Sequence, residues 1–252
     1  MQLKANLHLH SSEDPLDGHG ISYSFVEAID RAATLGFKVL AITHHERCNY
    51  TAELGAYGKT KGILLIPGIE QTIEGRHVLM LNVEKSAEQV KTFNDLRQYR
   101  RWHPECFVVA PHPYFYGNFS LHKQLDRHSD LFDAIELSWF YSRRCNRNLQ
   151  GAAAAQRYHK PFIATSDTHL INFLNQGFTT VEASDQTIPA FFAALRTGAH
   201  TNTTAPARFW RDMVLTMAYL ILRFDAMRVV LRLIGRIPGN KQVHVPAPEA
   251  SA

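Results

Sequence analysis

The chain has 252 residues, of which 45% are hydrophobic and 20% are charged. This balance is typical of globular proteins and excludes a disordered chain, and the length is sufficient for one large core such as that of an α/β barrel. The formal net charge of +4 is compatible with an anionic substrate or surface but establishes neither.

The three cysteines are odd in number and form no C-x-x-C pair. They therefore argue for a reducing compartment and against a disulfide framework or a zinc-ribbon site. The first residues do not read as a signal peptide, because Lys4 and Asn6 interrupt the apolar residues and two histidines follow. We expect a cytoplasmic protein.

The first expected strand covers residues 3–10 and ends in N-L-H-L-H. Side chains alternate along a strand, so His8 and His10 should share one face, with Leu7 and Leu9 on the other. An acidic turn with Asp17 follows. Taken alone, this stretch fits a metal site and a polar edge strand equally well.

Strands and helices alternate along the rest of the chain. A helix is expected at 24–35, where Ser24 can cap it, Glu27 lies three residues on and Gly36 ends it. Further helices are expected at 86–101 and 144–158. The expected strands are 38–44, 63–69, 77–83, 107–111, 134–138 and 162–165, with 178–181 as a weaker candidate. This alternation predicts a mainly parallel sheet, in a barrel or a doubly wound fold.

Metal-capable side chains recur where these apolar strands end or begin. They are His8, His10, His44, His45, Glu70, His77, His112, Asp167 and His169. Chance would instead scatter the 14 histidines over loops and helix surfaces. Functional residues of α/β folds gather where the strands end, so the pattern favours a metal centre at one rim of the sheet.

Five ordered motifs carry a family resemblance. H-L-H-S with the later D-G, A-I-T-H-H, P-G-I-E, A-P-H-P and S-D-T-H, spread over roughly residues 3–200, resemble the PHP family, named for its polymerase and histidinol phosphatase members. The resemblance implies a metal-dependent phosphoesterase with a distorted, TIM-like, seven-stranded (β/α)7 barrel. We assign residues 1–205 to this barrel.

The resemblance also implies three divalent metal ions, which we expect to be zinc, manganese or iron. By similarity, the first ion would be held by His8, His10, Glu70 and Asp167, the second by the bridging Glu70 with His77 and His112, and the third by Asp17, His45 and His169. His77 lies in the shortest motif. His44 replaces the acidic residue usual in the family, and we favour packing near the barrel mouth over a role in orienting a ligand or phosphate.

Imidazole and carboxylate ligands suit these metals, and closely spaced cations acidify a bound water so that hydroxide is available near neutral pH. We expect His10, Glu70 and Asp167 to carry catalysis, with a phosphomonoester or nucleotide phosphodiester as substrate. Two alternatives remain open, namely hydrolysis of a carbon–nitrogen bond on the same cluster and a catalytically silent PHP scaffold. No motif supports sequence-specific nucleic acid binding.

Candidate substrate contacts are Arg143 and Arg144, which follow the strand at 134–138, and His19, which follows Asp17. A guanidinium there can grip a phosphate through paired hydrogen bonds, but a solvated first helical turn explains the arginines equally well.

Residues 206–237 are expected to form an amphipathic helical extension, followed by a loose tail at 238–252. The uncharged run from Met213 to Leu222 is too short to span a bilayer. For residues 209–237 we favour packing on the barrel or a homodimer interface over contact with a membrane surface.

Overall fold

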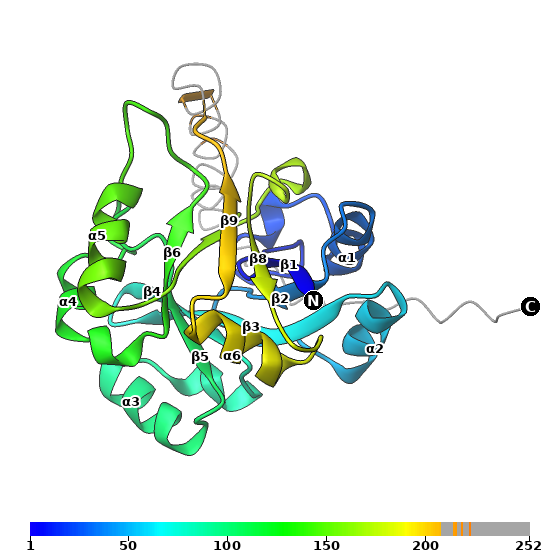
Figure 1. The fold of residues 1–252 in the computed structure, drawn as a ribbon, viewed down its shortest axis with the longest axis horizontal. Coiled ribbons are helices and arrows are strands. Elements are labelled where there is room, and N and C mark those ends of the chain that lie inside the picture. Colours follow the sequence, from blue (N-terminus) through cyan, green and yellow to red (C-terminus); the bar gives the residue numbers. More distant parts are fainter. Residues whose placement is uncertain (208–213, 216–217, 219–221, 223–252) are drawn as a thin grey trace, which may run out of the picture.

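The computed structural model describes residues 1–207 and residues 214, 215, 218 and 222 (Figure 1). The expected extension at 206–237 lies outside the described residues except for these few positions, and the expected tail at 238–252 lies wholly outside them. The homodimer or membrane contact expected from 209–237 therefore stays a prediction. Among the described residues, no helix combines the length and hydrophobicity needed to cross a membrane.

The described residues form one curved sheet of nine strands, in the order β7-β6-β5-β4-β3-β2-β1-β8-β9. The strands are β1 (Gln2–Asn6), β2 (Val39–Ile42), β3 (Leu64–Ile73), β4 (Arg76–Leu81), β5 (Phe107–Ala110), β6 (Ala134–Ser138), β7 (Phe162–Thr165), β8 (Gly177–Glu182) and β9 (His200–Thr204). Two parallel groups, β1–β3 and β5–β7, lie on either side of β4, which is antiparallel to both neighbours. β8 is antiparallel to β1 and β9.

The two edges of the sheet approach each other and nearly close it into a barrel. Across the gap, the hydroxyl of Thr179 on β8 donates to the carbonyl of Ala164 on β7 at 2.9 Å, and the Asn202 side chain on β9 accepts from the Ala164 amide at 2.8 Å. Gly177 allows this approach, because a Cβ there would lie 2.5 Å from the Thr165 carbonyl oxygen.

The expected α/β barrel is present, but its nine strands differ from the seven that we expected. β3 and β4 form a hairpin whose turn places Glu74 and Gly75 at φ 49° and 77°, the left-handed geometry of tight hairpins. β9 has the sequence HTNTT and is largely exposed, so it lacks the apolar alternation that signals a strand. The weaker candidate at 178–181 is confirmed as part of β8.

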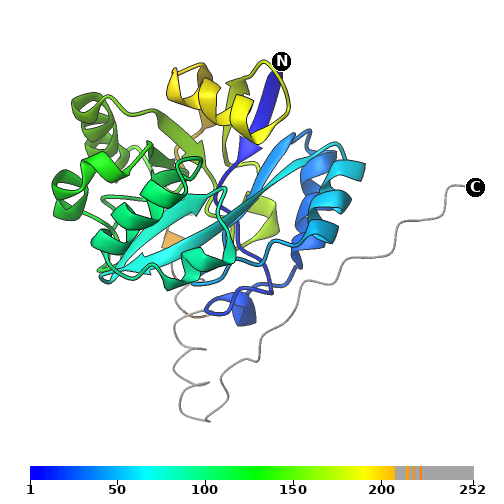
Figure 2. The same ribbon diagram turned by 90° about the horizontal axis from the view of Figure 1, so that it is seen from below.

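Helices surround the sheet, with α3, α4 and α5 on one side and α1 and α2 on the other (Figures 1 and 2). Their bounds are α1 (Phe25–Thr34), α2 (Ala52–Thr60), α3 (Phe93–Trp102), α4 (Lys123–Arg127), α5 (Asn148–Tyr158) and α6 (Ile188–Arg196). The helix expected at 86–101 is interrupted. A 3-10 turn at Lys85–Gln89 precedes α3, whose start is fixed by a capping box between Thr92 and Asp95.

The barrel interior is a single apolar cluster that includes inward-facing residues of eight strands, β1 to β8, and both phenylalanines of α6. Phe192 of α6 stacks on Phe107, the first residue of β5, with ring centroids 4.5 Å apart. Helix α6 thus covers the end at which β5 begins. The opposite end, where the parallel strands finish, is left for the polar residues described below.

The start of α1 gives a direct test of local stability. The Ser24 side chain accepts a hydrogen bond from the Glu27 amide, and the Glu27 carboxylate accepts one from the Ser24 amide. This is the cap predicted from the sequence. Replacing Ser24 by alanine should lower the free energy of unfolding by about 1 kcal/mol, because the Glu27 amide loses the hydroxyl that accepts its hydrogen bond. Urea denaturation measures this, with the exposed Ser184→Ala as a control. Equal midpoints for both variants would contradict the assignment.

Candidate metal centre

The polar cluster begins where β1 ends. The chain stays extended past Asn6, held by a bridge between Leu9 and Thr168 and by the hydroxyl of Thr43, which accepts from the Leu9 amide at 2.8 Å. His8 and His10 are fully buried and lie side by side, with ring centroids 5.2 Å apart. The alternation predicted from the sequence therefore places both imidazoles on one face.

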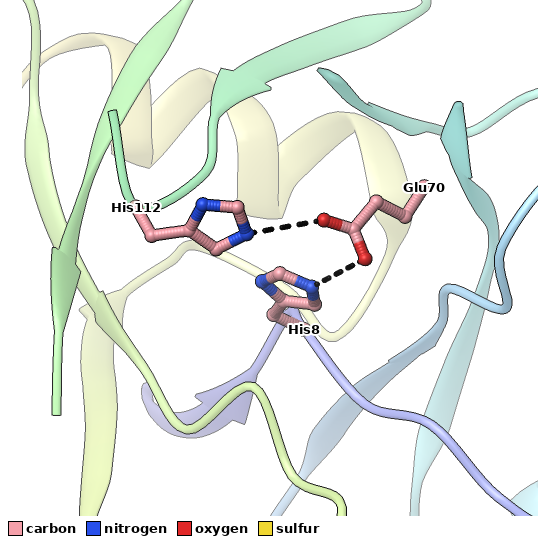
Figure 3. Close-up of side chains that lie close together, drawn as sticks. All are labelled: His8, Glu70 and His112. Atoms are coloured by element: carbon pink, nitrogen blue, oxygen red, sulfur yellow. Dashed lines mark hydrogen bonds and ion pairs between the residues drawn. The ribbon is translucent and has the colours of Figure 1, made fainter. Parts of the chain in front are cut away.

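Glu70, within β3, lies at the centre of the cluster and is 1% exposed. Its Oε2 lies 3.2 Å from Nε2 of His8, 3.2 Å from Nε2 of His10 and 3.1 Å from Nε2 of His45. Its Oε1 lies 2.9 Å from Nδ1 of His77 and 3.2 Å from Nε2 of His112. One carboxylate thus faces two sets of imidazoles through its two oxygens, of which Figure 3 shows one member each.

Asp167 and His169 follow β7 and complete the cluster from the other side. Oδ1 of Asp167 lies 3.4 Å from Nε2 of both His8 and His10. Nε2 of His169 lies 3.0 Å from Oδ2 of Asp17, so the loop after β1 is also connected to this rim. The ring of His10 is stacked between those of His45 and His169, each at 4.5 Å.

Two of these residues have unfavourable backbone conformations. His112 has φ 27° and Asp167 has φ 41°, in the region that side chains other than glycine rarely adopt. Such strain persists only where the surrounding structure enforces it, and it concentrates at functional sites. Here the conformation aims both side chains at the cluster.

The carboxylates and imidazoles of the cluster stabilise each other's charged forms. Burial opposes a charge on Glu70, but the nearby imidazoles of His77, His8 and His45 hold the pKa of its carboxyl well below the usual value. Burial likewise opposes a charge on His45, yet the carboxylates of Asp14 and Glu70 raise its pKa to about 9. The cluster therefore offers ionised carboxylates closely surrounded by ring nitrogens.

This donor set fits divalent metal ions. Four groups of three side chains each bring their ligand atoms within 4.8 Å of one another: His8–Glu70–His112, His8–His10–Asp167, His10–Asp14–His45 and His45–Glu70–His77. Several of the atoms aimed at the centre are buried without a hydrogen-bond partner, including Nε2 of His10 and Oδ1 of Asp167. Buried polar atoms normally have partners, and imidazole with carboxylate suits zinc, manganese or iron.

All nine side chains expected as ligands lie in this cluster, including His77, whose motif is the shortest. Their binding of ions stays a prediction. The grouping of His45 differs from the expected one. Its Nε2 faces Glu70, whereas its Nδ1 faces Asp14 at 3.0 Å and lies 4.0 Å from Asp17.

Two carboxylates of the cluster, those of Glu136 and Asp14, were not predicted from the sequence. Oε1 of Glu136, on β6, lies 2.9 Å from Nδ1 of His8, and its other oxygen accepts from the His112 amide. Asp14 lies between His10 and His45. The available signals were a buried carboxylate in the apolar strand A-I-E-L-S and a second acidic residue in the loop after H-L-H.

His44 is buried and points away from the centre. Asn49 Nδ2 donates to its Nδ1 at 2.7 Å, and its Nε2 lies 2.6 Å from the Ser11 hydroxyl. Burial lowers the pKa of His44 to about 3, so the ring is neutral. His44 therefore packs beside the mouth, held by hydrogen bonds on both ring nitrogens.

The expected substrate contacts lie in two segments of the chain outside the strands. Arg143 and Arg144 are exposed in the loop after β6, and His19 lies half-buried in the 3-10 turn Gly18–Gly20. Their contact with substrate stays a prediction. In the same loop, Arg147 stacks on Tyr116 at 4.4 Å beside a small pocket that reaches His112 and Glu136.

Comparisons with known proteins agree with this picture. Residues 146–200 match a family model described as PHP-associated. The fold is similar to that of a two-domain protein from Bacteroides vulgatus containing a predicted PHP-like metal-dependent phosphoesterase (TM-score 0.59, 17% identity, covering 81% of this chain and 65% of that one). Both findings agree with the PHP resemblance carried by the five sequence motifs.

The fold is also similar to that of PsfC from Pseudomonas syringae (TM-score 0.61, 14% identity, 90% of this chain and 99% of that one) and to that of the lesion-specific endonuclease PfuEndoQ from Pyrococcus furiosus (TM-score 0.57, 15% identity, 80% and 58%). The chain thus spans less than two thirds of the Bacteroides and Pyrococcus proteins. No curated protein matches the sequence.

Proposed function

We propose that the chain is a metal-dependent hydrolase of phosphate esters, acting on a phosphomonoester or a nucleotide phosphodiester at a site for three ions. The observation that carries the proposal is the Glu70 carboxylate, which presents each oxygen to a separate set of imidazoles. A carboxylate so placed can bridge two ions. The similar folds of proteins described as a PHP-like phosphoesterase and an endonuclease support the choice of a phosphate ester.

Bound divalent ions would supply an acidified water and positive charge that faces a phosphate group. The side chains of His8, His10, Glu70 and Asp167 would hold the first ion, His77 and His112 with Glu70 the second, and Asp17, His45 and His169 the third. Of these, Asp167 has the most exposed side chain, at 28%, with His77 and His169 at 19%. Substrate therefore approaches over Asp167, which can orient a water or accept its proton.

A substrate panel tests the proposal on the full chain loaded separately with Zn²⁺, Mn²⁺ or Fe²⁺. We expect turnover of p-nitrophenyl phosphate or bis-p-nitrophenyl phosphate and none of amides or lactones. Turnover of amides alone would replace the phosphate assignment by carbon–nitrogen hydrolysis. Stoichiometric ion binding without turnover of any compound would favour a silent scaffold and overturn the proposal.

A further inference from the structure

Asp14 contacts three predicted metal ligands, His10, His45 and Asp17. Its side chain is fully buried. Its Oδ2 lies 2.8 Å from Nδ1 of His10 and 3.0 Å from Nδ1 of His45, and it also accepts from the His45 amide at 2.9 Å. One carboxylate oxygen thus serves two imidazoles that reach the cluster from different strands.

The other oxygen of Asp14 shapes the loop that follows. Oδ1 accepts from the amides of Leu16 at 2.8 Å and Asp17 at 2.9 Å. These bonds fix the turn that carries Asp17 toward His169, whose Nε2 lies 3.0 Å from Oδ2 of Asp17. Asp14 therefore holds His10, His45 and Asp17 in one arrangement.

The contacts of Asp14 determine which ring nitrogens remain for an ion. When a neutral imidazole donates Nδ1–H to a carboxylate, its Nε2 carries the lone pair. In His10 and His45 these Nε2 atoms lie 3.2 and 3.1 Å from Oε2 of Glu70, at the centre of the cluster. An outer carboxylate on the far nitrogen is the usual way in which proteins fix the tautomer and orientation of metal-binding histidines.

We propose that Asp14 is a positioning residue that sets the tautomers of His10 and His45 together and so links the first and third ion positions. The proposal rests on the ligand assignment given under the proposed function. Direct ligation by Asp14 is disfavoured, because its two oxygens already accept from three backbone amides and lie within 3.0 Å of two ring nitrogens, against roughly four lone-pair sites of a carboxylate. Glu70, by contrast, faces only ring nitrogens in the contacts described above.

Asp14→Asn is the informative variant, since asparagine keeps the shape but has one acceptor oxygen and one amide donor. If the amide faces the imidazoles, both rings must accept at Nδ1, which leaves a proton on the Nε2 atoms that should bind the ion. If it faces the loop, it opposes the amides of Leu16 and Asp17. We expect Zn²⁺ affinity, measured by calorimetry with the metal alone, to fall about 10–100-fold.

Two variants serve as comparisons. Glu136→Gln disturbs the Nδ1 partner of His8 and the acceptor of the His112 amide, but it does not touch the contacts of Asp14, so it should leave the tautomers of His10 and His45 unchanged. Asp130→Asn removes an exposed carboxylate paired with Arg97 and should leave Zn²⁺ binding as in the wild type. Wild-type Zn²⁺ affinity and stoichiometry in Asp14→Asn would overturn the proposal.

A measurement on the wild type decides the matter even if Asp14→Asn does not fold. Nitrogen-15 NMR of the histidine rings in the Zn²⁺-loaded chain should show Nδ1–H in both His10 and His45. A proton on Nε2 of either ring, or an Asp14 oxygen at bonding distance from zinc in a crystal structure, would refute the role. Neither readout requires turnover, so failure of the phosphatase assay leaves this proposal to be judged separately.

Discussion

Replacing Glu70 by glutamine is expected to abolish hydrolysis and to prevent binding of the ions that we propose this carboxylate holds. The substitution exchanges one oxygen for an amide donor, so one of the two sets of ring nitrogens would face N–H groups instead of an acceptor. Loss of an outer partner of a metal ligand already costs about 10–100-fold, so loss of the bridging oxygen should reduce turnover by more than about 100-fold.

Turnover of p-nitrophenyl phosphate and elemental analysis of the purified variant measure this effect, and circular dichroism checks that the fold is intact. Glu182→Gln, an exposed position on β8, is the matched control and should behave as the wild type. A Glu70→Gln protein that retains wild-type metal content and turnover would contradict the central role of this residue.

Removal of metal is expected to abolish activity and to make stability depend on pH. The folded-state pKa of His45 is raised to about 9, from an ordinary value of 6.5. A raised pKa contributes stability fully below pH 6.5, and this contribution is lost as pH rises through 9. The shift corresponds to about 3 kcal/mol at most. The metal-free chain should therefore become less stable between pH 6.5 and 9.

Ion binding should have the opposite dependence over the same range. A ligand nitrogen must lose its proton before it binds a metal, so affinity for Mn²⁺ should rise with pH until His45 is neutral. Thermal melts at pH 6, 7.5 and 9, with chelator or with excess Mn²⁺, test both statements. A difference in melting temperature between the two forms that shrinks toward pH 9 would show that His45 does not exchange a proton for the ion.

The convergence of the ligand side chains was predictable because it follows from local geometry. The period of two along a strand puts His8 and His10 on one face, and the ends of parallel strands meet at one rim. The orienting carboxylates were not predictable in this way. Glu136 contacts His8 across 128 positions of the chain, and such a contact leaves no periodic signal near either residue.

The predicted number of strands and the predicted start of one helix were wrong, and both errors have local causes. β9 is polar and exposed, and an apolar pattern cannot reveal a strand that buries little. The helix expected at 86–101 rested on helical composition, although Thr92 and Asp95 have the spacing of a capping box. The capping box places the start of α3 correctly, whereas composition alone does not locate a helix boundary.

The gap between the two sheet edges, which we call the seam between β7 and the β8–β9 hairpin, determines how the side chains that follow β7 are anchored. The described hydrogen bonds across this seam join Phe162 and Ala164 of β7 to the side chains of Thr179, Asn202 and His200, and Asp167 and His169 lie in the segment that follows β7. In the described sheet, neighbouring strands in the order from β7 to β9 are joined by main-chain hydrogen bonds. The segment that carries Asp167 and His169 is anchored instead to the end of β1, because Thr168, which lies between them, forms main-chain hydrogen bonds with His8 and His10. A shift of β1 would therefore displace side chains on both sides of the cluster together.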